Sequence, residues 1–261
     1  MLNEGYSSYD LLRVAAHFRR SELEQDLHSR LNGLVADGPF RGMRCLPSAH
    51  ASTLSPKLLG TYEREIQNDL MKLAYSVDSF LDVGCAEGYY TTGLSLIPTI
   101  AQVVGVDINE HSLEAARKMA TINGVAHKCA FKTNLEDALT VLTGETLIMI
   151  DVDGSEINVL DKIFQCSAEN LLGRSSFLIE TDYHQNGASN KQDIIDKLQR
   201  SGFELTKEIK QDPVQRISSF AAKQTHSYLD LAIYGLEGRP LSQSWLLFNR
   251  GAQNMQATRQ Y

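Results

Sequence analysis

Short apolar runs alternate with amphipathic segments through the middle of the chain, from about residue 78 to residue 208. We predict strands for six of the runs, at about 79–83, 102–107, 128–131, 146–151, 176–181 and 203–208. Five segments between them have helical periodicity, at about 89–97, 110–123, 135–142, 155–164 and 190–200. Because such alternation is typical of βαβ units, the pattern predicts an α/β fold around a mostly parallel sheet.

Two later segments, THSYLDLAIYG (225–235) and SWLLFN (244–249), have strand-like composition but no helix between them. Consecutive strands without a helical crossover pair antiparallel. We therefore expect these two to form antiparallel strands at one edge, which makes the sheet mixed.

The N-terminal part has a different pattern. Residues 8–34 place leucines and other apolar side chains at helical spacing, which predicts an amphipathic arm with a break expected near Ser21. Residues 35–56 are rich in Gly, Pro and Ser and are predicted to be a connector. The arm needs an apolar partner, which is either the rest of the chain or a second copy in a homodimer.

A second helix is predicted after the connector. Ser55 is suited to the N-cap and Pro56 to the first helical position, and the helix should continue to about Tyr75. The expected organisation is thus a helical arm and connector (1–56), one α/β domain (57–250) and a polar C-terminal tail (251–261).

Composition narrows the class of protein. The 261 residues include 43% hydrophobic residues, and 25 Lys+Arg against 32 Asp+Glu give a net charge of −7. That charge disfavours nucleic acid and anionic membranes as partners and favours a small molecule. No apolar run is long enough to cross a membrane, and the four cysteines form no CxxC pair, so we expect a cytoplasmic protein with reduced thiols.

The first strand runs into a glycine-rich turn, FLDVGCAEGYYTTGL (80–94), with small residues at positions 84, 86 and 88. A dinucleotide fingerprint needs a small residue where this chain has Tyr89, so a nicotinamide or flavin cofactor is disfavoured. Asp107 ends the next strand, where a carboxylate can accept both hydroxyls of a ribose.

The turn, together with VVGVDINEHSLEAARKMATING, resembles the class I S-adenosylmethionine-dependent methyltransferases over roughly residues 60–235. The resemblance implies a Rossmann-like fold and S-adenosylmethionine as the cofactor. It implies that Asp107 holds the ribose, that Ile108 packs on the adenine, and that Asn134 and Leu135 meet the adenine edge. The floor under the methionine part would consist of Asp82, Gly84, Ala86 and Gly88. For Asn134, a plain helix N-cap is the alternative.

A narrower resemblance lies at the fourth strand. IMIDVDGSEINVL (148–160) is similar to the D-V-E-G-x-E-x-x-V-L segment of FkbM-type methyltransferases, mostly O-methyltransferases of sugars, polyketides and lipids. GTYE (60–63) is similar to a Y-E pair of that group, which places Glu63 among the cofactor residues. The chain departs from the pattern at Asp153, where the family usually has Glu.

Acidic side chains follow the fourth and fifth strands. Asp151 and Asp153 follow one, and Glu180, Asp182 and His184 follow the other, so all should converge beside the glycine turn. Asp151, Asp153, Glu180 or His184 could accept the proton of a hydroxyl acceptor, and Asp151 would also adjoin the cofactor.

Two alternatives to a catalytic role remain open for these acids. Asp151, Asp153, Glu180 and Asp182 could bind Mg²⁺ or Mn²⁺, or they could be solvated loop charges.

The sequence thus predicts a methyltransferase that acts on a hydroxyl of a small molecule. The alternatives are an RNA or protein methyltransferase and a cofactor-binding assembly protein without catalysis. Methylation of adenine N6 or glutamine is disfavoured, because the fourth strand ends in DVDG rather than in (N/D)-P-P-(Y/F).

Overall fold

The computed structural model describes residues 7–50, 52–167, 169–184, 186–212, 216–217, 222–225, 227–235 and 243–250. The chain divides into two compact units. Residues 1–64 and 212–239 form the helical unit, and residues 65–211 and 240–261 form the sheet unit. The predicted C-terminal tail, 251–261, lies outside the described residues.

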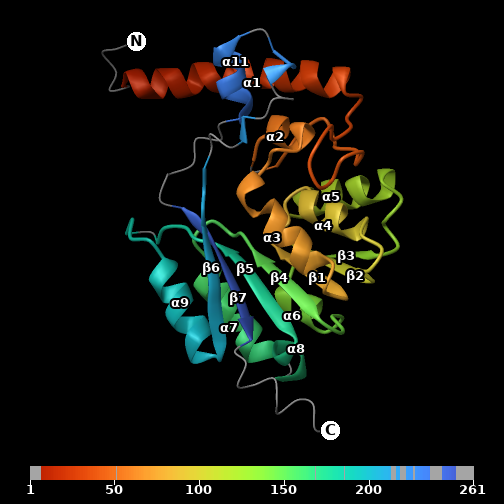
Figure 1. Cartoon of the computed structure of the whole chain (residues 1–261), viewed down its shortest axis with the longest axis vertical. Coiled ribbons are helices and arrows are strands. Elements are labelled where there is room, and N and C mark those ends of the chain that lie inside the picture. The colour runs from red at the N-terminus through yellow and green to blue at the C-terminus, as the bar shows by residue number, and fades with distance from the viewer. Residues whose placement is uncertain are drawn as a thin grey trace. The chain divides into compact units, whose positions relative to one another are not determined.

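The sheet unit contains a seven-stranded sheet with the order β3-β2-β1-β4-β5-β7-β6 (Figure 1). The strands are β1 (Ser79–Val83), β2 (Gln102–Val106), β3 (Cys129–Lys132), β4 (Thr146–Ile150), β5 (Ser175–Glu180), β6 (Phe203–Lys210) and β7 (Ser244–Arg250). Strands β1 to β5 pair in parallel, and β7 pairs antiparallel with both β5 and β6. The prediction of a mixed, mostly parallel α/β sheet is confirmed.

Helices cover both faces of this sheet (Figure 1). Those of the sheet unit are α3 (Arg64–Ala74), α4 (Tyr89–Ser95), α5 (Glu110–Ile122), α6 (Leu135–Leu139), α7 (Glu156–Cys166), α8 (Glu169–Gly173) and α9 (Lys191–Arg200). On one face, α6 to α9 pack on a continuous apolar core that includes Leu81, Ile148, Phe177 and Leu246. On the other face, Thr91 of α4 reaches Asp82 of β1, and Asp69 of α3 pairs with Lys207 of β6.

The register explains this core. Leu81 pairs with Ile148, Ile148 with Phe177, and Ile179 with Leu246. Since side chains alternate between the faces of a strand, aligned apolar positions form one continuous layer across the sheet. The short connections between strands and helices, together with this apolar layer, produce the α/β fold that the sequence predicts.

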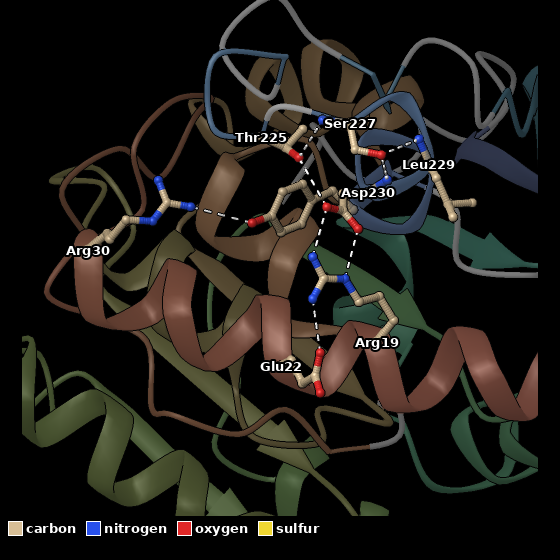
Figure 2. A network of polar contacts seen from close by, with 8 residues as sticks. Arg19, Glu22, Arg30, Thr225, Ser227, Leu229 and Asp230 are labelled. Atoms are coloured by element: carbon tan, nitrogen blue, oxygen red, sulfur yellow. Dashed lines mark hydrogen bonds and ion pairs between the residues drawn. The ribbon is translucent and has the colours of Figure 1, made fainter.

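The helical unit contains α1 (Ser8–Arg30), α2 (Leu54–Leu59) and α11 (Tyr228–Gly235). Figure 2 shows the polar contacts that join α1 to the segment around α11. Arg19 donates to both carboxylate oxygens of Asp230, each at 2.9 Å, and Arg30 donates to Oε1 of Gln224, also at 2.9 Å. Segments more than 190 positions apart in the sequence are thereby held together.

The prediction of a strand at 225–235 is wrong, because residues 228–235 form α11. Ser227 Oγ accepts the N–H groups of Leu229 and Asp230, which satisfies donors of the first turn. Asp230 lies in that turn and is paired with Arg19. These local and tertiary contacts outweigh the β-propensity of the apolar side chains. Strand β7 consequently lies between β5 and β6 rather than at an edge with residues 225–235.

The single helix predicted from Ser55 to about Tyr75 is also wrong, since α2 and α3 are separate. Gly60 ends α2 with a left-handed φ of 71°, and a Cβ there would lie 1.9 Å from the backbone oxygen of Asp37. Ser55 is inside α2 rather than its N-cap. The carboxylate of Glu24 accepts the N–H groups of Leu54 and Ser55, so α1 supplies the cap.

The expected break in the arm near Ser21 is absent, because α1 is continuous from residue 8 to residue 30. Ser21 Oγ donates to the carbonyl oxygen of His17, four residues earlier, which keeps the hydroxyl satisfied within the helix. None of the helices in the described part of the chain combines the length and apolar character needed to cross a membrane.

Candidate functional site

The glycine turn lies between the ends of β1 and β4. Gly84 has φ 90°, and a Cβ at this residue would lie 1.7 Å from the backbone oxygen of Asp151. Gly88 caps α4 with φ 81°, and its Cβ would lie 2.9 Å from Cβ of Ala116 in α5. Ala86, between them, also has a left-handed φ of 46°. Only glycine fits the first two places, so the turn presents its backbone rather than side chains at this edge of the sheet.

Three carboxylates surround this turn. Asp82 of β1 pairs with Gly105 of β2 and with Met149 of β4. Asp107 and Asp151 come two residues after these partners, so alternation places them on the same face as Asp82. Both act electrostatically on Asp82. The carboxyl ends of β1, β2 and β4 thus form an edge with concentrated negative charge.

Glu180 continues this edge on β5. Leu178 pairs with Met149, and Glu180 lies two residues beyond Leu178, on the same face. Its side chain is buried and accepts a hydrogen bond from Nε2 of Gln211, the residue that follows β6. The structure therefore aligns Glu180 with Asp151, as the sequence predicted for the ends of neighbouring strands.

Asp82 is fully buried against α4. Thr91 Oγ1 donates to its carboxylate at 2.6 Å. The pKa of Asp82 is raised to about 7, mainly by burial; the bond from Thr91 opposes the increase, and the negative charges of Asp151 and Asp107 add to it. A positively charged group beside Asp82 would stabilise the ionised form of this acid.

Asp107 anchors the glycine turn. Its carboxylate accepts the N–H of Ala86 at 2.9 Å and the N–H of Asn109 at 2.8 Å, one at each oxygen. Each carboxylate oxygen can accept more than one hydrogen bond, so both can still accept hydroxyl donors. The next residue, Ile108, is 94% exposed, which offers an apolar surface directly beside this carboxylate.

Asn134 and Leu135, which are predicted to meet the adenine edge, have structural roles in the described residues. Asn134 is the N-cap of α6, where Oδ1 accepts the N–H of Asp137 at 2.8 Å and Nδ2 donates to the Asp137 carboxylate at 2.9 Å. The N-cap alternative for Asn134 is therefore what the structure shows. The side chain of Leu135 belongs to the apolar core. A contact of either residue with adenine stays a prediction, as does that of Glu63, which belongs to the helical unit.

A second network lies beyond the ends of β4 and β5, and the sequence did not indicate it. Glu156 is buried at the start of α7, and its carboxylate accepts the N–H of Gly154 at 3.0 Å and a bond from Nδ2 of Asn190. Oδ1 of Asn190 accepts the N–H of Asp182 at 2.8 Å. Burial raises the pKa of Glu156. The buried pair Glu156 and Asn190 thus joins the loops that carry Asp153 and Asp182.

The remaining predicted site residues, Asp153, Asp182 and His184, differ in exposure and in their contacts. Asp153 is exposed, with a left-handed φ of 48°. Asp182 accepts a bond from Nε2 of Gln243 at 3.1 Å, and Nε2 of His184 lies 2.8 Å from the Asp193 carboxylate of α9. His184 is therefore oriented by α9.

The structure brings only part of the predicted cation site together. Asp151 and Glu180 offer carboxylate oxygens within 4.8 Å of each other, whereas neither Asp153 nor Asp182 belongs to such a group in the described residues. Glu180 and Asp182 accept bonds from amide groups instead. The prediction of a divalent cation is therefore not supported.

Comparison with known proteins agrees with this geometry. Residues 76–172, from just before β1 to α8, match the family model described as "Methyltransferase domain". This segment is similar to methyltransferase domains. The match supports a class I, S-adenosylmethionine-dependent type of methyltransferase, and the strand order and the glycine turn agree with it. No curated protein sequence matches the chain.

Three solved structures show a distant similarity to this chain. The ribosomal protein L11 methylase of Lactobacillus delbrueckii subsp. bulgaricus has 13% identity and a TM-score of 0.47, over 72% of this chain and 78% of that one. The B. subtilis M1A22 tRNA methyltransferase TrmK has 13% identity and a TM-score of 0.49, over 72% and 66%. A precorrin 8w decarboxylase of Methanobacterium thermoautotrophicum has 15% identity and a TM-score of 0.48, over 80% and 96%. At this level of similarity they say nothing about the acceptor.

The residues of the domain fit S-adenosylmethionine. The cofactor carries a sulfonium and an ammonium group, and both positive charges suit an edge with Asp82, Asp107 and Asp151. Asp82 and Asp151 would repel the pyrophosphate of a dinucleotide, which binds to backbone N–H groups at a helix N-terminus. The Asp107 carboxylate and exposed Ile108 suit a ribose and an adenine ring, respectively. When bound, the cofactor supplies an electrophilic methyl group.

Proposed function

We propose that the protein is a FkbM-type methyltransferase that methylates a hydroxyl group of a small molecule. The observation that carries this proposal is the pair Asp151 and Glu180, aligned on one face at the ends of β4 and β5 beside the glycine turn. A hydroxyl acceptor needs a proton acceptor as it attacks the methyl group, and carboxylates at this edge supply one. The DVDGSE segment at β4, similar to that of FkbM-type enzymes, supports the same class.

In this proposal the residues have distinct tasks. Asp107 accepts hydrogen bonds from the ribose, and the backbone of the glycine turn supports the methionine part. Asp151 holds the acceptor hydroxyl and takes its proton, because it is half-buried and its backbone adjoins Gly84. Glu180, oriented by Gln211, holds a second polar group of the acceptor. Alignment of the hydroxyl with the methyl group then supplies much of the rate.

The proposal can be tested in two stages. Calorimetry should show that S-adenosylhomocysteine binds and that NAD does not. Labelled cofactor is then offered to a panel of hydroxylated small molecules, with RNA and protein fractions as the counter-panel. Transfer to a small-molecule hydroxyl supports the proposal, whereas transfer to RNA or protein alone refutes it.

Site variants separate chemistry from cofactor binding. With a methylated acceptor identified, Asp151→Asn should lower turnover by about 10²–10⁴-fold with nearly unchanged affinity for S-adenosylhomocysteine. Glu136→Gln, at a half-exposed acid of α6 that pairs with Lys162, is the matched control and should change neither quantity. If Asp151→Asn retains full turnover, Asp151 is not the proton acceptor.

We also propose that the protein is located in a reducing compartment such as the cytoplasm. The free thiols of four cysteines support this, namely Cys45, Cys85, Cys129 and Cys166. Chemical labelling of the thiols in freshly lysed cells checks this, since all four should react after denaturation without a reductant.

A further inference from the structure

The buried pair Glu156 and Asn190, here called the loop clamp, joins the loops that follow β4 and β5. Glu156 is the first residue of α7 and is 1% exposed, and Asn190 precedes α9 and is fully buried. In the described residues the Glu156 carboxylate accepts bonds from two neutral donors, the N–H of Gly154 and Nδ2 of Asn190, and makes no ion pair. An apolar pair would fill this space without burying a charge, so the polar pair is suited to fixing a geometry rather than to stabilising the core.

Asn190 holds the backbone directly after Glu180. Its Oδ1 accepts the N–H of Asp182 at 2.8 Å, and its own N–H donates to the carbonyl oxygen of Asp182 at 2.9 Å. Thr181, between them, donates its N–H to the carbonyl oxygen of Ser244 at 2.8 Å. Asn190 is the N-cap residue of α9, but its side chain makes no capping bond. The side chain thus serves the β5 loop rather than the helix that it precedes.

Glu156 holds the loop that begins with Asp151. The N–H of Asp151 donates to the carbonyl oxygen of Val83 at 3.0 Å, and three residues later the N–H of Gly154 donates to the Glu156 carboxylate at 3.0 Å. Gly154 has φ 90°, and a Cβ at this residue would lie 2.7 Å from the carbonyl oxygen of Tyr183 in the β5 loop. Glycine therefore lets the two loops approach closely, at the point where Glu156 holds one of them.

The two loops carry the carboxylates of the proposed site. The pairing of β4 with β5 ends at Ile150 and Ile179, and Asp151 and Glu180 are the next residues. These two acids offer carboxylate oxygens within 4.8 Å of each other. Two ionised carboxylates at this distance repel each other. The loop clamp opposes their separation, because it links the third residue after Asp151 to the second residue after Glu180.

We infer that Glu156 and Asn190 are positioning residues, which set the spacing of Asp151 and Glu180 for the acceptor hydroxyl. The inference rests on the proposed function, since this spacing matters for the reaction only if both carboxylates hold the acceptor. A small displacement of groups that align reactants lowers the rate by a large factor. Loss of the loop clamp should therefore lower kcat, whereas the affinity for the cofactor should not change.

An exchange of the two functional groups tests the inference. Glu156→Gln leaves one acceptor oxygen for two donors, and Asn190→Asp leaves no donor between two carboxylates. Each variant should lower kcat by about 10–100-fold for methyl transfer to the hydroxylated compound found in the panel. The double variant Glu156→Gln/Asn190→Asp reverses donor and acceptor and keeps every bond of the loop clamp. It should restore kcat to within about threefold of the wild type.

Two further measurements separate positioning from a purely structural role. Calorimetry should give the same affinity for S-adenosylhomocysteine in all variants. Urea unfolding should show that each variant is folded under the conditions of the assay, so that a lower kcat does not reflect unfolded protein. Asn158→Asp, exposed on α7, makes the same substitution outside the loop clamp and should leave kcat unchanged.

Several results would overturn the inference. Folded single variants that retain full kcat would do so, as would a double variant that is no more active than the single ones. If Asn190→Asp does not fold, Glu156→Gln and the double variant still decide. A wild type that methylates no hydroxylated compound refutes the proposed function and the inference together, whereas equal activity of the wild type and the single variants refutes the inference alone.

Discussion

The buried carboxyl of Asp82 should make the stability of the sheet unit depend on pH. Its pKa is 3.8 when unperturbed and about 7 in the folded protein, with burial as the main cause. The folded state therefore binds a proton that the unfolded state releases between these values. The stabilisation is fully present below pH 3.8 and is lost as the pH rises through about 7.

The variant Asp82→Asn isolates this contribution. Asparagine is nearly isosteric with the protonated acid and can still accept the bond from Thr91, but it cannot ionise. At about 1.4 kcal/mol per pKa unit, the difference between 3.8 and about 7 corresponds to roughly 4 kcal/mol. The unfolding free energy of the variant, relative to that of the wild type, should therefore rise by up to this amount as the pH increases from acidic to mildly basic.

Urea unfolding at a series of pH values measures the effect. Trp245 is the sole tryptophan and is fully buried in β7, so its fluorescence reports unfolding of the sheet unit. Asp196→Asn, at a half-exposed acid of α9, is the control and should not follow the same curve. A difference in unfolding free energy between Asp82→Asn and wild type that stays constant from pH 4 to pH 8 would refute the reasoning.

Three further substitutions test the glycine turn and its surroundings. Gly84→Ala places a methyl group 1.7 Å from the backbone oxygen of Asp151 at a φ of 90°, so we expect loss of soluble protein or of S-adenosylhomocysteine binding; a normal melting temperature and affinity would contradict this. Asp107→Ala should weaken S-adenosylhomocysteine binding by about 1–3 kcal/mol in calorimetry, and equal affinity would remove it from the site. Asn190→Ala should lower the free energy of unfolding by about 1–3 kcal/mol, because Glu156 loses a buried donor; urea unfolding with no measurable change would show that the network is not stabilising.

Local patterns were sufficient for the regular part of the fold. The alternation of short apolar runs and amphipathic segments predicted strands β1 to β6 and the helices α4 to α7 and α9 to within a few residues. Period-two alternation and helical spacing depend only on neighbouring residues, so they are visible in the sequence. The glycine turn was equally visible, because left-handed backbone at Gly84 and Gly88 requires that residue type.

Local patterns failed where distant residues decided the structure. Asp230 of the helix at 228–235 is paired with Arg19, 211 positions earlier. The Glu24 carboxylate, from another helix, starts α2 in place of Ser55. Neither of these two contacts has a signature in the sequence, since each depends on side chains that only the folded chain brings together. The cap from Ser227 is local, and the β-propensity of the apolar side chains concealed it.

For the candidate site, the sequence by itself determined which acids follow which strands, and the tertiary structure decided which of them share a face. Asp107, Asp151 and Glu180 align because the strand register places them at equivalent positions, and Asp82 lies two residues earlier on the same face. Asp182 and His184 follow the same strand as Glu180 but are drawn to Gln243 and Asp193. A carboxylate takes the nearest geometrically suitable donor, and which donor is nearest depends on the packing of the whole domain rather than on the spacing along the chain.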